Sequence, residues 1–169
     1  MPKATSEGEM NASQVRQGEK KRKWYAIGAR RQEVKNGALR APRDSIEKNT
    51  TVHDRLAVCR MDETSLRSNG YLVTAWVGEA ADACCIVHGY ADGSLSTPER
   101  PPLGASFYAN SFLPNGQGRY DLTRMATSLD PTGGGHANAC VCRIQPPGLD
   151  ANMEHWLDMW SRRDDALRL

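Results

Sequence analysis

The sequence lacks any apolar run close to the roughly 20 residues that a membrane-spanning helix requires, so we expect no membrane contact. It also lacks a secretory hydrophobic segment near residue 1, and its five cysteines include no C-x-x-C pair. These absences predict reduced thiols in an intracellular protein, located in the cytoplasm or an organelle matrix and not secreted. The composition that remains, 39% hydrophobic and 25% charged over 169 residues, is that of one globular domain, with or without a tail.

Positive charge is concentrated at the start of the chain. Residues 1–43 hold 11 Lys and Arg against 4 Glu, whereas the remaining residues hold 11 basic against 16 acidic side chains. A basic arm on a mildly acidic body is typical of proteins that touch nucleic acid; a solvated tail that only maintains solubility is the alternative. We interpret residues 1–43 as a basic arm, flexible or ordered by a partner, in which Trp24 and Tyr25 either stack on bases or dock the arm onto its own domain.

Hydrophobic periodicity predicts the order strand, helix, strand, strand, helix, glycine loop, strand, helix. This order indicates an α/β protein with a small mixed β-sheet and flanking helices. We divide the chain into the arm 1–43, a domain 44–147 and a C-terminal amphipathic helix 148–169. The expected strands are 23–29, 55–60, 83–90, 105–112 and 137–144, with a hairpin at Asn36-Gly37, and the expected helices are 69–80, 120–129 and 149–169, the last N-capped by Asp150.

Several side chains have ordinary structural explanations. The spacing of Leu66, Val73 and Trp76 predicts one buried helix face, and that of Trp156 and Trp160 another, with His155 outward. We expect His88 to be a strand-end histidine bonded to backbone. Four cysteines in two close pairs could form a thiol cluster or a metal site, although their spacing argues against a metal: Cys84, Cys85, Cys140 and Cys142.

The stretch "TGGGHANACVC", Thr132–Cys142, places three glycines directly before a histidine. Backbone without Cβ atoms lets N–H groups converge and a phosphate approach closely, and an imidazole adds a hydrogen-bond donor or a positive charge. No Gly-Lys-Ser/Thr follows, so the stretch is not a Walker loop, and it is not G-x-G-x-x-G. It therefore predicts either a phosphate cradle built on a tight turn, with positive φ at Gly134, or a glycine turn with an incidental histidine.

The segment from about Arg55 to Ile144 resembles the DHHA1 domain, the C-terminal substrate-binding half of DHH-family phosphoesterases. Three matches carry the resemblance, in the family's order: "SFYAN" at Ser106–Asn110, "DLTRMA" at Asp121–Ala126 and "GGGHANA" at Gly133–Ala139. In the family the glycine-histidine motif closes over the nucleotide or phosphate of the substrate. The resemblance thus implies a DHHA1-like fold, with these substrate contacts: Gly133, Gly134, Gly135, His136 and Asn138.

Departures from the family pattern are as informative as the matches. The family's metal ions lie in a separate N-terminal domain, on spaced aspartates and an Asp-His-His triplet. Here His53-Asp54 is reversed and isolated, and Phe107-Tyr108 replaces the arginine often found in the first matched strand. The resemblance therefore covers a binding half without a catalytic half. We expect no catalytic residue, no metal ligand and no cofactor, with Mn²⁺ or Mg²⁺ present only if a separate catalytic subunit supplies it.

Two function classes follow. The first is a non-catalytic RNA-binding or structural subunit of a larger assembly such as a ribonucleoprotein, which binds RNA or a short oligonucleotide and a protein partner. The second is the substrate-binding half of a DHH-type phosphoesterase, a nano-RNase or a cyclic-dinucleotide phosphodiesterase, that works with a separate metal-binding subunit. In both, the basic residues nearest the motif in sequence are candidate phosphate contacts: Arg119, Arg124 and Arg143.

Overall fold

The computed structural model describes residues 43–64, 66, 68–90 and 97–169. The strand expected at 23–29 and the hairpin expected at Asn36-Gly37 lie outside the described residues. A helical stretch at 43–49 comes first. It is followed by β1 (Thr50–His53), β2 (Leu56–Met61), α2 (Gly70–Val77), a 3₁₀ turn (Gly78–Ala80), β3 (Ala83–His88), β4 (Gly104–Ala109), α3 (Thr123–Leu129), β5 (Gly134–His136), β6 (Ala139–Arg143), α4 (Leu149–Ser161) and α5 (Arg163–Ala166).

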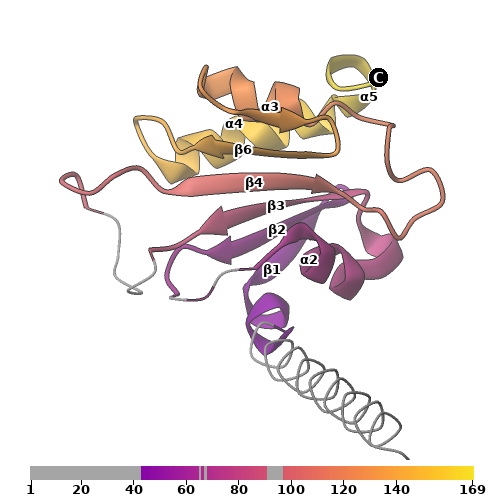
Figure 1. The fold of residues 1–169 in the computed structure, drawn as a ribbon, viewed down its shortest axis with the longest axis horizontal. Helices are drawn as coiled ribbons and strands as arrows, with labels where there is room; N and C mark the ends of the chain where they lie inside the picture. The colour runs from indigo at the N-terminus through magenta and orange to yellow at the C-terminus, as the bar shows by residue number, and fades with distance from the viewer. Residues whose placement is uncertain (1–42, 65, 67, 91–96) are drawn as a thin grey trace, which may run out of the picture. The chain divides into compact units, whose positions relative to one another are not determined.

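The six strands form one mixed sheet in the order β1-β2-β3-β4-β6-β5 (Figure 1). Strands β2 and β3 are parallel and are connected through α2, whereas all other neighbouring pairs are antiparallel. Five of the six residues of β3 are buried, as a strand flanked on both edges and covered on both faces requires. The small mixed sheet with flanking helices that the sequence predicts is confirmed.

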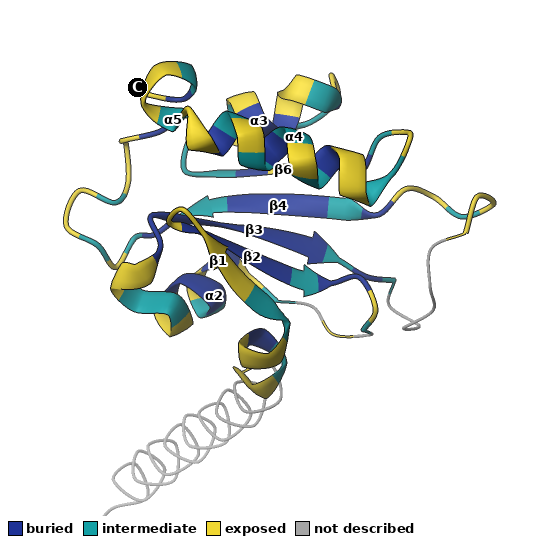
Figure 2. Ribbon diagram, turned by 180° about the vertical axis from the view of Figure 1, so that it is seen from behind, coloured by how far each residue is buried: buried dark blue, intermediate teal, exposed yellow. Residues whose placement is uncertain are grey.

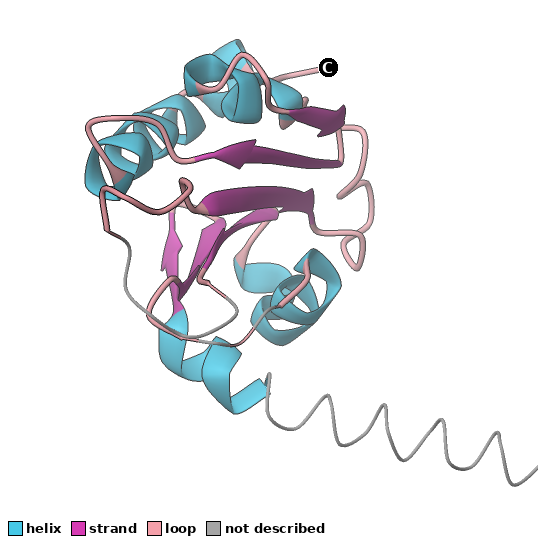
Figure 3. Cartoon of the chain, turned by 60° about the vertical axis from the view of Figure 1, so that its left-hand side comes forward, coloured by secondary structure: helices cyan, strands magenta, loops and turns pink. Residues whose placement is uncertain are grey.

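Helices pack on both faces of the sheet (Figure 3). On one face α3 and α4 cover β3, β4 and β6, and the ring of Trp156 meets Phe107 edge to face at 5.0 Å between centroids. On the other face α2 and the helical stretch 43–49 cover β2 and β3 through Val73 and Ile46. Burial is accordingly deepest in the central strands (Figure 2).

The C-terminal helix belongs to the same core as the sheet. Trp156 and Trp160 are 0% and 1% exposed, which confirms the inward face expected from their spacing. The predicted helix 149–169 is, however, two helices that break at Arg162. The predicted N-cap is also wrong, because Gly148 precedes the first helical residue and Asp150 lies within the first turn, where a carboxylate still complements the helix dipole. His155 is half-buried instead of outward.

Helix α2 begins where the sequence predicts, because Asn69 caps it and its side-chain oxygen accepts the N–H of Leu72 at 3.1 Å. The expected inward face is correct at Val73, which is 0% exposed, and wrong at Leu66 and Trp76, which are 36% and 38% exposed. The reason is Gly70, which lies so close to β4 that a Cβ there would sit 2.0 Å from Cγ of Tyr108. This close approach turns Gly70, Val73 and Thr74 toward the sheet and Trp76 outward.

The hairpin of β1 and β2 was not expected from the sequence. Its two-residue turn, Asp54-Arg55, has positive φ at both positions, 43° and 68°. The Arg55 guanidinium donates two hydrogen bonds to Asp82, at 2.9 and 2.6 Å, and these bonds hold the pKa of Asp82 below its usual range. The indole N–H of Trp160 donates to the carbonyl of Asp54 at 2.8 Å. The turn therefore ties β3 and α4 to the first strand pair.

All five cysteines are buried free thiols. Burial raises the pKa values of Cys140 and Cys142 to about 12, so both thiols are protonated at neutral pH. Within the described ranges, no group of three or more His, Cys, Asp or Glu side chains is placed to hold a metal ion. In the same part of the chain, no helix has the length and apolarity needed to cross a membrane.

Candidate functional site

The glycine-histidine stretch forms a strand and not a loop. Gly134–His136 is the edge strand β5, paired antiparallel with β6 across the two-residue turn Ala137-Asn138. Among its glycines the positive φ belongs to Gly135, at 142°, and not to Gly134 as a tight turn would require. A Cβ on Gly135 would lie 2.5 Å from the carbonyl oxygen of Ala139, because β5 and β6 approach closely there. The expected glycine loop is thus a glycine-dependent hairpin.

Hydrogen bonds fix the hairpin turn from three sides. The carbonyl of Ala137 accepts the N–H of Leu122, and the carbonyl of Asn138 accepts the N–H of Ala109, each at 2.9 Å. The side-chain oxygen of Asn138 accepts the N–H of Gly118 at 2.8 Å. Because the start of α3, the end of β4 and the loop after β4 all hold this turn, the residues beside it, including His136, have a fixed position.

Asp130 fixes the approach to the hairpin from the other end. One carboxylate oxygen accepts the N–H and the hydroxyl of Thr132, at 3.0 and 2.7 Å, and the other accepts the N–H of Arg143 at 2.8 Å. The hydrogen bonds from Thr132, followed by the one from Arg143, hold the pKa of Asp130 below its usual range. An ionised Asp130 therefore links the segment entering β5 to the end of β6.

Half of one sheet face is open. On the face that α2 covers at β2 and β3, the register also places residues of β4, β6 and β5. Val141 is 55% exposed, and no atom lies within 4 Å of the point where a Cβ on Gly134 would be. In the described structure α2 contacts Tyr108 through Gly70, and no helix covers β6 and β5 on this face. The residues of β4, β6 and β5 on this face are Ser106, Tyr108, Gly134, His136, Ala139, Val141 and Arg143.

His88 ends β3 on this same face. Its Nε2 and the Ser106 hydroxyl are hydrogen-bonded at 2.7 Å. The strand-end position predicted for His88 is confirmed, and the neighbouring strand supplies a side-chain hydroxyl to its Nε2. Ser106 is 4% exposed, so this pair is a structural contact inside the sheet and not a reactive one.

A pocket of about 200 Å³ lies between the first turn of α2 and the β5–β6 hairpin. His136 and Asn138 both line it, so the structure brings together two of the predicted substrate contacts. Sequence reasoning missed Tyr71, which is 60% exposed, and Gln117. In the sequence, the feature that could have identified Tyr71 is an aromatic residue two positions after a helix N-cap. No feature of the sequence points to Gln117. The full lining is Gly70, Tyr71, Tyr108, Ala109, Gln117, His136, Asn138 and Ala139.

The remaining predicted contacts do not line this pocket. Gly133, Gly134 and Gly135 precede His136 on the hairpin, and Gly134 leaves its backbone uncovered on the open face. Arg143 is exposed on that face, four residues along β6 from Ala139, or roughly 13 Å in an extended strand.

Arg119 and Arg124 are engaged elsewhere. Arg119 lies 3.9 Å from carboxylate oxygens of both Asp82 and Asp164. Arg124 pairs with Asp121 at 3.6 Å and donates to the carbonyl of Ala166 at 3.0 Å. Their expected phosphate contacts remain predictions, without support from their present partners.

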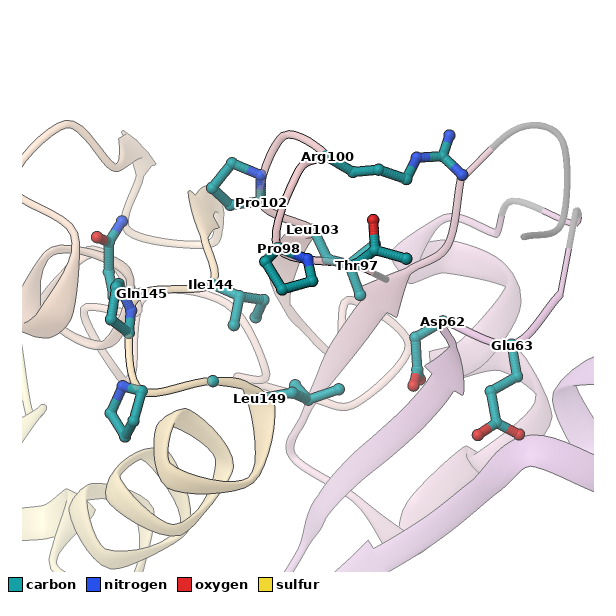
Figure 4. Close-up of a pocket in the computed structure, with 13 residues that line it drawn as sticks. Asp62, Glu63, Thr97, Pro98, Arg100, Pro102, Leu103, Ile144, Gln145 and Leu149 are labelled. Carbon is teal, nitrogen blue, oxygen red and sulfur yellow. The ribbon is translucent and has the colours of Figure 1, made fainter. Parts of the chain in front are cut away.

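A larger cavity, of about 620 Å³, lies at the opposite end of the strands (Figure 4). Proline-rich segments 97–103 and 144–149 form two walls, with Leu103, Ile144 and Leu149 between them, and Asp62 and Glu63 stand at one side (Figure 4). Burial, the largest single influence, raises the pKa of Asp62, but hydrogen bonds from Arg60 at 2.7 and 2.9 Å, a backbone hydrogen bond and the charge of Arg60 together outweigh it and lower the pKa. The carboxylates of Asp62 and Glu63 and the guanidinium of Arg100 all line this cavity, so its charges do not by themselves select or reject a phosphate.

Comparisons with known proteins support the fold. No protein-family model and no curated protein matches the sequence. Among solved structures, a pGpG-specific phosphodiesterase from Vibrio cholerae is similar at a TM-score of 0.61 and 14% identity, over 78% of this chain and 41% of that one. An exopolyphosphatase-related protein from Bacteroides fragilis is similar at 0.51 and 14%, over 74% and 35%. Both neighbours are DHH-superfamily proteins. The fold is DHHA1-like.

The chain corresponds to only part of its neighbours, about two fifths of the first and one third of the second. At 14% identity the likeness concerns the fold and does not extend to activity or substrate. The fold resemblance inferred from the "SFYAN", "DLTRMA" and "GGGHANA" motifs is confirmed. The binding roles of the motif residues remain predictions.

Proposed function

We propose that this chain binds the phosphate backbone of RNA or a short oligonucleotide on the open half of its sheet, and that it serves as a non-catalytic RNA-binding or structural subunit of a larger assembly. The observation that carries the proposal is that His136 and Asn138 line one pocket beside the uncovered backbone of Gly134. Both side chains come from a hairpin fixed by its hydrogen bonds, so the site needs little rearrangement to bind a ligand.

The chemistry of the pocket suits a nucleotide. The imidazole of His136 is exposed and can donate to a phosphate oxygen. The side-chain oxygen of Asn138 already accepts the Gly118 N–H, so its NH₂ group remains as a donor. Tyr71 and Tyr108 add two aromatic rings to the lining, and aromatic rings are the surfaces on which single-stranded bases stack.

A binding role is favoured over a hydrolytic one by the side chains available. Phosphoester hydrolysis with two metal ions needs several carboxylates and imidazoles that converge on one point. The described residues bring no such group together. A protein partner in the larger assembly is part of this proposal.

The alternative is the substrate-binding half of a DHH-type phosphoesterase, with Mn²⁺ or Mg²⁺ held by a separate subunit. The observation that favours it is that one structural neighbour is named as a pGpG-specific phosphodiesterase and the other as an exopolyphosphatase-related protein. Because the alternative holds its metal on a separate subunit, the assay that separates the two functions uses the chain together with the proteins that co-purify with it, Mn²⁺ and a short oligoribonucleotide. We expect no turnover, and turnover abolished by His136→Ala would establish the alternative.

Replacing His136 with alanine should weaken oligonucleotide binding by about 1–3 kcal/mol, the range for a hydrogen bond to a charged group. The exposed position of the side chain predicts an unchanged melting temperature. Calorimetric titration with a short oligoribonucleotide, together with thermal melts, provides the measurement. His53→Ala is the matched control, since His53 is an exposed histidine on the opposite edge strand. Equal losses in both variants, or none in either, would contradict a contact at His136.

The basic arm supplies a separate test. If residues 1–43 contact nucleic acid, the affinity for a longer single-stranded RNA should fall steeply with salt, and deleting the arm should flatten that slope. With 11 basic residues in the arm, even partial engagement would change the slope by several units of log affinity per log salt concentration. An identical slope with and without the arm would leave it as a solubility tail or a protein-docking segment.

A further inference from the structure

We propose that the pocket at His136 selects adenine, with the base stacked on Tyr71 and its hydrogen-bonding edge on the side-chain amide of Gln117. This assignment rests on the proposed nucleotide-binding function and names the base that the same site accepts. It is carried by two lining residues that the glycine-histidine motif does not include.

The Tyr71 side chain is not packed into the core of the fold. It lies in the first turn of α2 and is 60% exposed, although the residues around it in that helix, Gly70, Val73 and Thr74, are buried. Tyr71 lines the pocket together with residues of the β5–β6 hairpin. An exposed aromatic ring at the wall of a pocket that also holds donors for phosphate is a stacking platform, and stacking one base is worth roughly a tenfold gain in affinity.

Gln117 supplies the side-chain amide that would hydrogen-bond to the edge of the base. Its side chain is exposed and makes no hydrogen bond to another described residue. The next residue, Gly118, donates its N–H to Asn138, so the loop that carries Gln117 is tied to the hairpin that carries His136. A free carboxamide offers one donor and one acceptor side by side, which is the pattern complementary to N7 and the N6 amino group of adenine.

The pocket also lacks the groups that read guanine and cytosine. Guanine O6 and N7 are recognised by Arg or Lys, and the cytosine N4 amino group by a carboxylate. Among the described residues, none of these four types lines the pocket, where the polar side chains are the two tyrosines, Gln117, His136 and Asn138. Arg119 and Arg124, nearby in sequence, are held by carboxylates elsewhere. The site therefore favours adenine over guanine, unlike the neighbour that is named as pGpG-specific.

Titration of the full chain with the dinucleotides pApA and pGpG tests the assignment, at an ionic strength of about 0.3 M to screen non-specific phosphate contacts. We expect pApA to bind about tenfold more tightly, the discrimination typical of one amide–adenine pair. Gln117→Ala should reduce that ratio to about one by weakening pApA alone. Tyr71→Ala should weaken both dinucleotides about tenfold and equally, and Tyr71→Phe should restore both affinities.

Two variants serve as matched controls. Gln145→Ala removes a glutamine that lines the larger cavity, and Phe112→Ala removes a ring that is 59% exposed but does not line the His136 pocket. Both should leave the pApA to pGpG ratio unchanged. Equal binding of the two dinucleotides, or a ratio that survives Gln117→Ala, overturns the adenine assignment and leaves the proposed function standing. Binding of neither dinucleotide overturns both.

Discussion

Trp156→Ala should lower the free energy of unfolding by about 3–5 kcal/mol, the cost of removing a fully buried aromatic side chain. Trp156 is 0% exposed and packs edge to face on Phe107. Its indole N–H donates to the carbonyl of Met125 at 3.1 Å, so one ring joins α4 to both α3 and β4. Losing the ring leaves a cavity between all three elements. Urea unfolding curves of wild type and variant, analysed with a common slope, measure the loss.

Two further variants identify the cause of that loss. Trp156→Phe keeps an aromatic ring and removes the hydrogen bond, so it should cost less than alanine. Trp76→Ala should change stability by no more than about 1 kcal/mol, because Trp76 is 38% exposed on α2. A cost below about 1 kcal/mol for Trp156→Ala would mean that α4 does not anchor to the sheet and instead serves a partner surface.

The strands most easily predicted from the sequence are those that are buried on both faces. Strands β2 and β3 correspond to the stretches "RLAVCR" and "ACCIVHGY". A short, continuous apolar run of this kind is typical of a strand that is covered on both faces. Strand β1 escaped prediction for the opposite reason. Its residues are mostly exposed, and its turn uses Asp54 and Arg55 with positive φ, where Asn-Gly would have given a recognisable signal.

Helix orientation depends on contacts that the helix's own sequence does not contain. The spacing around Trp76 suggested an inward face, but Gly70 allows α2 to lie against Tyr108, and this contact between residues 38 positions apart determines which side faces the sheet. The tryptophans of α4 were predicted correctly because two indoles four residues apart dominate the apolar area of that helix.

The residues of the candidate site also divide into those that the sequence predicted and those that it did not. His136 and Asn138 were found because they belong to one continuous motif, and the hairpin turn places both beside the same pocket. Tyr71 and Gln117 reach the pocket from α2 and from the loop after β4, so only the sheet topology brings them there. The three arginines were chosen by closeness in sequence; Arg119 and Arg124 lie in ion pairs and do not line the pocket, and the phosphate contacts of all three stay predictions.

The conformation of the glycine triplet gives the second large effect. Gly135→Ala should lower the free energy of unfolding by about 2–6 kcal/mol, because two penalties act together. Placing a side chain at φ 142° costs about 1–3 kcal/mol of backbone strain. Its Cβ would also lie 2.5 Å from the carbonyl oxygen of Ala139 and 2.8 Å from Cα of Cys140, and forcing these backbones apart costs a further 1–3 kcal/mol.

Gly134→Ala separates folding from binding at the neighbouring position. Gly134 has no positive φ and no atom within 4 Å of a new Cβ, so this variant should unfold within about 0.5 kcal/mol of wild type. The new methyl group would project onto the open face, where the proposed phosphate approaches bare backbone, so oligonucleotide affinity should fall while stability is kept. Chemical unfolding and calorimetric titration of both variants give the two readouts. A stable Gly135→Ala beside an unfolded Gly134→Ala would place the strained turn at Gly134 and refute the hairpin, because only the hairpin register puts the close backbone approach at Gly135.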